Sequence, residues 1–495
     1  MEEKNIVAID LGTSKIALTV AKVSGEDIQI VYYKETPSAG IRYSSVYNIQ
    51  QVTEPLGRII RDAEDALDIK ITQAVVGMPK YPVRQESNSG VIKDRGEDMD
   101  ITAEDIADLK SYAEDSYPLE NPDKEAIYGA VAQSFSDGEN FQIIENDIIG
   151  MTSDILEGHF KIFIGKKSDL KKIDTVMSKT GISVRKKYFT ADTTAKAVLT
   201  ESEMENGVAL IDFGGGCTSV SIYHGSIMRH YASIPFGGKN ITNDIKTEGQ
   251  ISSRLAENIK LAFGACMPEK LQNLSEKVLH IRSDNSEPDK KLPVKYLSEI
   301  ITARVEEIIM AMLYEINESG FADMLRSGIV ITGGCAQIAN LGSFIYDLSG
   351  YRVRTGYPLG RISTVGCDGI KETSAATSMG LILAAKDEQS LNCAISRSEG
   401  KPCSVIIETA EETAETHVEA KNEAVTEKSE EDPAENGRLF KDSEIEKVEK
   451  KPEKKKDREP GLLNILWRNA RKKAEEAAKL TGKLLDEISE EDIQH

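Results

Sequence analysis

The chain has 495 residues, which at about 150 residues per domain allows roughly three domains or one large two-lobed body with tails. Its formal net charge is −21, so it lacks the positive field that a general nucleic-acid binder needs. No run approaches the roughly 18 uncharged apolar residues of a membrane span, and the acidic start of the chain does not resemble a signal peptide. We therefore expect neither a membrane-spanning helix nor secretion.

The six cysteines are scattered, without a Cys-x-x-Cys pair or a histidine at metal-ligand spacing. This usage is typical of a reduced, cytoplasmic protein. Cys217 and Cys335 lie in glycine-rich segments, where a catalytic thiol is conceivable. We interpret both as small space-filling residues.

Two segments share one pattern, an apolar β-type run, a glycine-containing corner and a second β-type run. The first covers residues 5–20 and has Asp10 at its corner. The second covers residues 208–223 and has Asp212 at the matching place. A repeat after about 200 residues indicates an internal duplication and predicts two similar lobes.

Two such hairpins suit a nucleoside triphosphate held between two lobes. Glycine lets the backbone approach closely, so that amide and hydroxyl groups can donate to phosphate oxygens. The predicted binding residues are Asp10, Gly12, Thr13, Ser14, Lys15, Asp212, Gly214, Gly215, Gly216 and Thr218. The two aspartates follow directly from the strands, and we expect them to hold Mg²⁺ through its waters. Either corner alone would be an ordinary turn, so the prediction depends on their pairing.

A third glycine corner, with Gly333 and Gly334, follows the buried-strand run at residues 329–332. Its bare backbone offers a surface for an adenine or a ribose, although a plain strand-to-helix turn is an equal alternative. No Gly-Lys pair has the P-loop spacing, and Ser219 stands where a dinucleotide fingerprint needs its third glycine.

The hairpins, the third corner and two helical connectors at residues 191–199 and 375–385 resemble the superfamily of actin, DnaK-type chaperones and sugar kinases. Within it, residues 4–386 resemble the FtsA family of bacterial cell-division proteins. The segments that carry the closer resemblance are residues 87–90, 101–106, 133–135, 146–151, 156–157, 237–245 and 256–260.

The resemblance implies an α/β, two-lobed actin-like (ribonuclease-H-like) fold with an inserted subdomain in each lobe. The implied subdomains are 1A at 1–82 and 164–198, 1C at 83–163, 2A at 199–238 and 303–386, and 2B at 239–302. It also implies ATP and Mg²⁺ in the cleft, a head-to-tail filament, and binding of the C-terminal peptide of the tubulin-like FtsZ through 2B. The filament would tether the FtsZ ring to inner-membrane lipids, on the cytoplasmic face at the division septum.

Two departures from the family bear on hydrolysis. Ser219 stands where most relatives have an acid after the second glycine run. Lys196 stands in the first connector where hydrolysing relatives place a Gln or Glu that positions the attacking water. A protonated lysine cannot act as a base, so we expect ATP binding with weak or absent turnover.

The C-terminal part has a different composition. Residues 387–460 contain almost no large apolar side chain, which predicts a disordered charged linker. In residues 461–490 apolar residues recur near helical spacing with cations on the other side, which predicts an amphipathic helix in a lipid interface. Its predicted membrane contacts are Leu462, Leu463, Leu466, Trp467, Arg468 and Arg471. A helix that docks on protein is the alternative, and the alanine-rich second half favours it.

Two other functions share part of this sequence pattern. A sugar-kinase-type phosphotransferase would need a substrate pocket and an Asp base, and nothing beyond the shared hairpins supports it. A pilus-assembly scaffold of the PilM type shares the fold and the insert. PilM-type proteins usually lack a long tethered amphipathic tail, so the tail favours FtsA over PilM.

Overall fold

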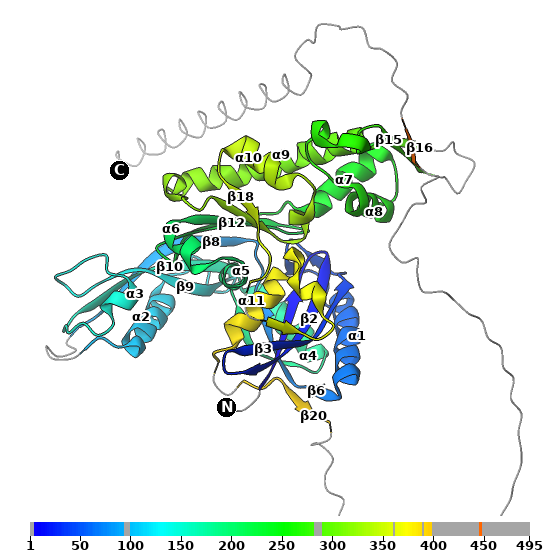
Figure 1. The fold of residues 1–495 in the computed structure, drawn as a ribbon. Helices are drawn as coiled ribbons and strands as arrows, with labels where there is room; N and C mark the ends of the chain where they lie inside the picture. Colours follow the sequence, from blue (N-terminus) through cyan, green and yellow to red (C-terminus); the bar gives the residue numbers. More distant parts are fainter. Residues whose placement is uncertain are drawn as a thin grey trace, which may run out of the picture. The chain divides into compact units, whose positions relative to one another are not determined.

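The computed structural model describes residues 4–93, 100–281, 290–359, 362–388, 391–397 and 445–447, and these residues form two α/β lobes (Figure 1). None of the helices in these ranges is both long and apolar enough to span a bilayer. The predicted helix at 461–490 and almost all of the predicted linker at 387–460 lie outside the described residues.

The sheet of the first lobe is built on the predicted N-terminal hairpin. Its strand order is β11-β7-β1-β2-β3-β19, and β1 and β2 are antiparallel, with Asp10 opposite Ala17. The strands are β1 (Lys4–Leu11), β2 (Lys15–Ser24), β3 (Asp27–Pro37), β7 (Gln73–Gly77), β11 (Ser183–Tyr188) and β19 (Ile362–Thr364). The helices of this lobe are α1 (Ile49–Leu67), α4 (Lys167–Lys179), α5 (Thr190–Val198) and α11 (Ala376–Ala385), and a short hairpin of β4 (Ile41–Arg42) and β5 (Ser45–Val46) precedes α1.

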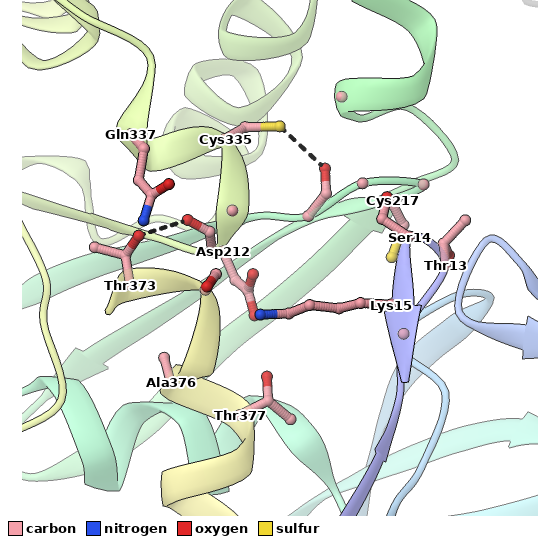
Figure 2. Close-up of a pocket in the computed structure, with 18 of the residues that line it drawn as sticks. Thr13, Ser14, Lys15, Asp212, Cys217, Cys335, Gln337, Thr373, Ala376 and Thr377 are labelled. Carbon is pink, nitrogen blue, oxygen red and sulfur yellow. Dashed lines mark hydrogen bonds between the residues drawn. The ribbon is translucent and has the colours of Figure 1, made fainter. Parts of the chain in front are cut away.

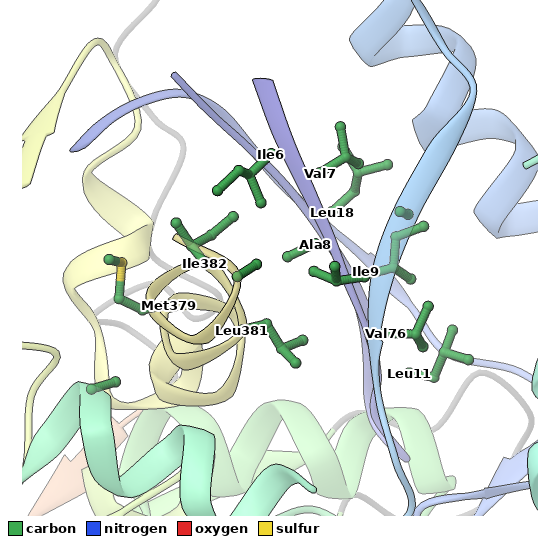
Figure 3. Close-up of a cluster of buried hydrophobic side chains, with 14 of the residues drawn as sticks. Ile6, Val7, Ala8, Ile9, Leu11, Leu18, Val76, Met379, Leu381 and Ile382 are labelled. Atoms are coloured by element: carbon green, nitrogen blue, oxygen red, sulfur yellow. The ribbon is translucent and has the colours of Figure 1, made fainter. Parts of the chain in front are cut away.

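Strand β1 is buried on both faces, which explains its nearly continuous apolar sequence. Ile6, Val7 and Ile9 have no exposed surface. Figure 3 shows Met379, Leu381 and Ile382 of α11 gathered beside β1. The hairpin corner that follows β1 therefore projects from a rigid core.

The second lobe repeats this topology. Its strand order is β14-β13-β12-β17-β18. Strands β12, β13 and β14 form an antiparallel unit, and β12 pairs in parallel with the later strand β17. In the same way, β1 of the antiparallel unit β1–β3 pairs in parallel with β7. The strands are β12 (Val208–Phe213), β13 (Thr218–His224), β14 (Ile227–Ile234), β17 (Ile329–Thr332) and β18 (Val353–Thr355). The predicted duplication and the two-lobed fold are confirmed.

The remaining elements of the second lobe are mostly helical. The helices are α6 (Glu201–Asn206), α7 (Gly238–Gly249), α8 (Ser253–Phe263), α9 (Val294–Glu318) and α10 (Leu341–Ser349), with single 3₁₀ turns at Pro268–Lys270, Gln272–Leu274, Ala322–Met324 and Gly334–Gln337. A small sheet has the order β16-β15-β21, formed by β15 (Lys277–Ile281), β16 (Lys290–Pro293) and β21 (Ile445–Lys447). Two further 3₁₀ turns, Asp368–Lys371 and Thr373–Ala375, precede α11.

Helices α5 and α11 lie close to the predicted connectors and pack against each other beside the cavity that Ala376 and Thr377 of α11 help to line. They pack at very short range because Gly380 has no side chain: a Cβ there would lie 2.1 Å from the carbonyl oxygen of Thr193. The hydroxyls of Thr194 and Thr377 are hydrogen-bonded across the contact, 3.2 Å apart.

An inserted subdomain follows β7 and has its own core. Its elements are β8 (Val83–Ile92), α2 (Ala103–Ser116), β9 (Glu125–Ser136), α3 (Glu145–Ile148) and β10 (Leu156–Lys166), and its sheet has the order β8-β10-β9. Leu109, Phe135 and Phe160 are buried between this sheet and α2. Its span is close to the predicted 83–163.

The body continues beyond the predicted end at residue 386. Strand β20 (Ala394–Ser396) pairs antiparallel with β6 (Ile69–Ile71). The N–H of Cys393 donates to the carbonyl of Asn5 at 2.7 Å, and Leu391 is 1% exposed. The packed body therefore runs to Arg397, which corrects the expectation that the linker starts at 387. The buried residues of this segment are Leu391, Cys393 and Ala394. One leucine and two small residues are too weak a hydrophobic pattern to predict a packed strand in a region of polar composition.

Candidate functional site

A cavity of about 410 Å³ lies between the two hairpin corners (Figure 2). Thr13 and Ser14 lie on one side of it and Gln337 and Thr373 on the other, with Asp212 between them. Of the predicted binding residues, those that line the cavity are Asp10, Gly12, Thr13, Ser14, Lys15, Asp212, Gly214, Gly215, Gly216, Gly333 and Gly334. The three glycine corners, which are far apart in sequence, thus surround one site.

Thr218 is the exception. Its side chain is fully buried, and its hydroxyl donates to the carbonyl oxygen of Phe236 at 2.9 Å. Thr218 thus holds the segment that leads into α7 and does not line the cavity, which corrects its predicted role as a phosphate donor. The alternation of β13 decides this, because the side chains of successive strand residues point to opposite faces.

The tips of the two hairpins touch. A Cβ on Gly216 would lie 2.4 Å from Cγ2 of Thr13, and one on Gly215 would lie 1.9 Å from Oγ of Ser14. Lys239 strengthens the contact, because its ammonium donates to the carbonyl of Thr13 at 2.6 Å. The glycines of the second hairpin are needed for close approach of the lobes, in addition to any contact with a ligand.

Lys80 contributes a positive charge at the bottom of the cavity. It lies three residues after β7, contacts the carboxylate of Asp212, and donates to Oγ1 of Thr377 at 3.2 Å. Burial alone would lower the pKa of Lys80, but the carboxylates of Asp212 and Asp10 raise it overall. The ammonium stays charged at neutral pH and faces both predicted acids. Sequence reasoning missed Lys80 because nothing local connects it with residue 212.

The two aspartates line the same cavity, as the metal prediction requires. Burial raises the pKa of Asp10, and the positive charges of Lys80 and Lys15 offset part of that rise. Two carboxylates at one wall are a donor set that suits Mg²⁺ bound through water. Within the described residues, no group of three His, Cys, Asp or Glu side chains is placed to hold a metal directly. Phosphate oxygens would have to complete any coordination.

The opposite end of the cavity has a polar and an apolar wall. On α8, the ammonium of Lys260 lies 2.8 Å from Glu257 and donates to Oγ1 of Thr242 at 2.9 Å. Leu261 and Ile338 supply apolar surface beside them. This end suits a base and a ribose. Sequence reasoning missed Glu257 and Lys260 as site residues, although their i, i+3 spacing on a helix was a usable signal.

The third corner requires glycine. Gly333 has φ +88°, and a Cβ there would lie 2.6 Å from Oδ1 of Asp212. The hydroxyl of Thr373 donates to the carbonyl of Gly333 at 3.0 Å. This corner therefore approaches the acid of the second hairpin closely enough for one ligand to contact both.

Burial disfavours the thiolate form of the two cysteines of the cavity at neutral pH. Burial raises the pKa of the Cys217 thiol to about 12 and that of the Cys335 thiol to about 11. Cys335 packs closely, since a Cβ on Gly238 would lie 2.5 Å from its sulfur. Both fill space, as the sequence interpretation held.

Lys196 does not line the cavity. Its ammonium pairs with Asp192 at 3.0 Å on α5, and its side chain is 53% exposed. The part of α5 that adjoins the Lys80 segment is its first residue, Thr190, whose hydroxyl donates to the carbonyl of Met78 at 3.1 Å. Lys196 therefore does not occupy the expected water-positioning site, since it lies more than a turn from that end of the helix.

Comparison with known proteins assigns the family. A family model described as cell division protein FtsA matches residues 209–380. The cell division protein FtsA of Neisseria meningitidis serogroup B is 30% identical over 390 residues, which are 78% of this chain and 91% of that protein. The chain belongs to the FtsA family of cell-division proteins.

Other FtsA proteins match over a similar range. The FtsA of Pseudomonas aeruginosa is 27% identical over 78% of this chain and 90% of that protein, and the FtsA of Escherichia coli K12 is 25% identical over 77% and 90%. Among solved structures, a PilM-PilN type IV pilus biogenesis complex matches with a TM-score of 0.54 at 12% identity, over 77% of this chain and 99% of that chain. That similarity shows the actin-like fold alone, whereas sequence identity places the chain with FtsA.

Proposed function

We propose that this FtsA-family chain binds ATP with Mg²⁺ between its lobes and polymerises head to tail on the cytoplasmic face of the cell membrane. There it connects the FtsZ ring to the membrane at the septum. The observation that supports ATP binding best is the convergence of both hairpin corners, the third glycine corner and Lys80 on one cavity. Mg²⁺ would neutralise phosphate charge beside the two aspartates.

Each part of the site has a role in this proposal. The backbone N–H groups at the hairpin corners and the hydroxyls of Thr13 and Ser14 face the phosphates. The ammonium of Lys80 pairs with the terminal phosphates in place of Asp212. Glu257 and Lys260 bind the ribose hydroxyls, and the base lies against Gly334 and Ile338.

The described cavity supports slow turnover. Of the four carboxylates that line it, Glu35 is engaged with Lys15 and Glu257 with Lys260, while Asp10 and Asp212 would face Mg²⁺. A carboxylate held by a cation is a poor base. We expect the nucleotide to act mainly as a structural ligand of the assembling protein.

The partners follow from the family assignment. Subdomain 2B, which contains α7, α8, β15 and β16, would bind the C-terminal peptide of FtsZ. The tail helix at 461–490 would bind lipid through the bulky residues of its first two turns. Many weak helices displayed on one polymer would give stable attachment.

Purified protein tests this function in two steps. Calorimetry with ATP should show saturable binding that Mg²⁺ strengthens. Pelleting with anionic liposomes should then recover the protein, and a synthetic FtsZ C-terminal peptide with it. A wild-type protein that does not bind ATP would refute the nucleotide site, and protein that stays in solution with liposomes would refute the membrane role.

A further inference from the structure

The phosphate-facing lysine lies at the joint of the inserted subdomain. β7 ends at Gly77 and β8 begins at Val83, so Lys80 is in the middle of the segment that connects the first-lobe sheet to the insert. Its ammonium and its backbone are both held by the second lobe. The ammonium contacts Asp212, and its carbonyl accepts a hydrogen bond from the hydroxyl of Tyr231 at 2.7 Å.

Tyr231 lies on β14, and this strand also contacts the inserted subdomain. The N–H of Tyr231 donates to Oε1 of Gln85 at 3.0 Å, and the Nε2 of Gln85 lies 2.8 Å from Nδ1 of His230. The Nε2 of Gln133 on β9 donates to the carbonyl of Met228 at 3.0 Å. Strand β14 is therefore bound at once to the joint and to the sheet of the insert.

The Tyr231 hydroxyl can be removed without disturbing its ring. Tyr231 is 2% exposed, and its ring packs edge-on against Phe189, with centroids 5.0 Å apart, and against Phe163, at 6.1 Å. These contacts involve the ring alone. A phenylalanine would keep them and would lose the hydrogen bond to the carbonyl of Lys80, together with the polar contacts of the hydroxyl with Ser219 and Ser233.

We propose that Tyr231 positions Lys80 for the phosphates of a bound nucleotide and, through Gln85, couples occupation of the cavity to the inserted subdomain. This rests on the proposed nucleotide-binding function. A phosphate that takes the ammonium from Asp212 changes one of the two contacts that hold Lys80 to the second lobe. The Tyr231 contact then transmits the change to β14 and β8, because both lie within one hydrogen-bonded set.

The test compares Tyr231→Phe with Tyr128→Phe in the full chain. Tyr128 is 4% exposed and donates its hydroxyl to the carbonyl of Lys166 at 3.1 Å, so it loses the same kind of bond, but within the first lobe. Calorimetry gives the ATP–Mg²⁺ affinity of each variant. Amide hydrogen exchange at residues 83–92 and 227–234, with and without ATP, gives the coupling.

In the wild type, ATP should slow exchange at both segments. Tyr231→Phe should weaken ATP binding by roughly two- to tenfold, the effect of one hydrogen bond, and should abolish the ATP-dependent change at 83–92 under saturating ATP. Tyr128→Phe should keep the wild-type affinity and the wild-type change. Gln85→Leu, which leaves Lys80 and its contacts intact, should bind ATP as the wild type does and lose the change at 83–92.

The outcomes separate the two proposals. If the Tyr231→Phe and Gln85→Leu variants keep the ATP-dependent change in hydrogen exchange at residues 83–92, the coupling is overturned, while the proposed nucleotide binding still stands. If Tyr128→Phe also loses the coupling, the special role of Tyr231 is overturned, because removal of any buried hydroxyl would then have the same effect. No ATP binding by the wild type would refute the nucleotide site itself.

Discussion

Lys80 of the first lobe and Asp212 of the second lobe form a buried ion pair across the cavity. The two side chains are only 15% and 8% exposed, so the pair is largely screened from water. Because each partner belongs to a different lobe, the pair holds the lobes together, and it presents a cation where phosphates would lie. The same two residues thus bear on stability and on binding.

Replacing Lys80 with Met should lower both the stability of the folded protein and its affinity for ATP. The change leaves the carboxylates of Asp212 and Asp10 without their nearest cation, and breaking a buried pair in this way costs about 3–5 kcal/mol of folding free energy. ATP affinity should fall roughly tenfold or more, since a hydrogen bond to a charged group is worth about 1.5–3 kcal/mol. Urea unfolding and calorimetry measure the two effects.

The matched variant Lys80→Arg keeps the charge and should retain most of the stability. The deficit of Lys80→Met should shrink as the pH falls, because the stranded carboxylate of Asp10, whose pKa burial raises, then takes up a proton and becomes neutral. Equal stability of Lys80→Met and the wild type at pH 7 would show that the pair does not hold the lobes together.

Acid should weaken the contact between β14 and the inserted subdomain. Burial lowers the pKa of His230 to about 4, and the charge of Lys161 contributes. Between pH 6.5 and about 4 the unfolded chain protonates this histidine and the folded chain does not, so stability falls as the pH drops through that window. The loss from this group approaches about 3 kcal/mol.

Urea unfolding of His230→Asn should show a smaller loss over the same window. His159→Asn serves as the control, because the side chain of His159 is 53% exposed and belongs to the inserted sheet. An unchanged pH profile in His230→Asn would mean that other groups cause the acid sensitivity.

The close contact of α5 with α11 should make Gly380→Ala costly. The added methyl group would lie 2.1 Å from the carbonyl oxygen of Thr193, so α5 and α11 must separate. Overpacking of this kind costs about 1–3 kcal/mol. ATP affinity should also fall, because these helices support the base of the cavity.

Gly342→Ala is the matched control for this change. Gly342 is also helical, on α10, and its nearest neighbour would be Cγ1 of Val353 at an ordinary 3.8 Å. There the substitution should stabilise by up to about 1 kcal/mol through helix propensity. Thermal unfolding compares the two variants, and a Gly380→Ala protein as stable as Gly342→Ala would contradict the packing argument.

Membrane attachment should depend on the first two turns of the helix that the sequence predicts at residues 461–490. Changing Leu463 and Trp467 together to Glu replaces two of the four bulky apolar residues predicted to contact lipid there, and burial free energy scales at about 25 cal/mol per Å². The double variant should no longer pellet with anionic liposomes and should bind ATP normally. Changing Ala474 and Ala478 to Glu adds the same charge farther along and should have the smaller effect.

Salt gives a second measurement on the tail. Arg468 and Arg471 each add on the order of 1 kcal/mol against anionic lipid, a contribution that ions screen. Wild-type binding should therefore weaken as salt rises. A Leu463, Trp467 double variant that still pellets with liposomes would support the protein-docking alternative for this helix.

Local patterns accounted for the features that the sequence predicted well. Each hairpin is a run of consecutive residues whose β-type pattern and corner residues can be recognised in the amino-acid sequence. The repetition of the hairpin indicated two lobes. The tail linker was predicted from composition, and its start was placed too early. Leu391 and Cys393 are buried, and the backbone of Cys393 is hydrogen-bonded to Asn5 and Thr72, which no local pattern records.

The sequence by itself determined which segments form strands and corners, because backbone preference and hydrophobic alternation act between neighbours. It also determined that Asp10 and Asp212 stand at equivalent places in a duplicated unit. Only the tertiary structure decided that Lys80 meets Asp212 and that Lys196 faces away from the cavity. The reason is physical: contact between residues more than a hundred positions apart depends on how sheets and helices pack, and packing places side chains by distance and direction, which spacing along the chain does not specify.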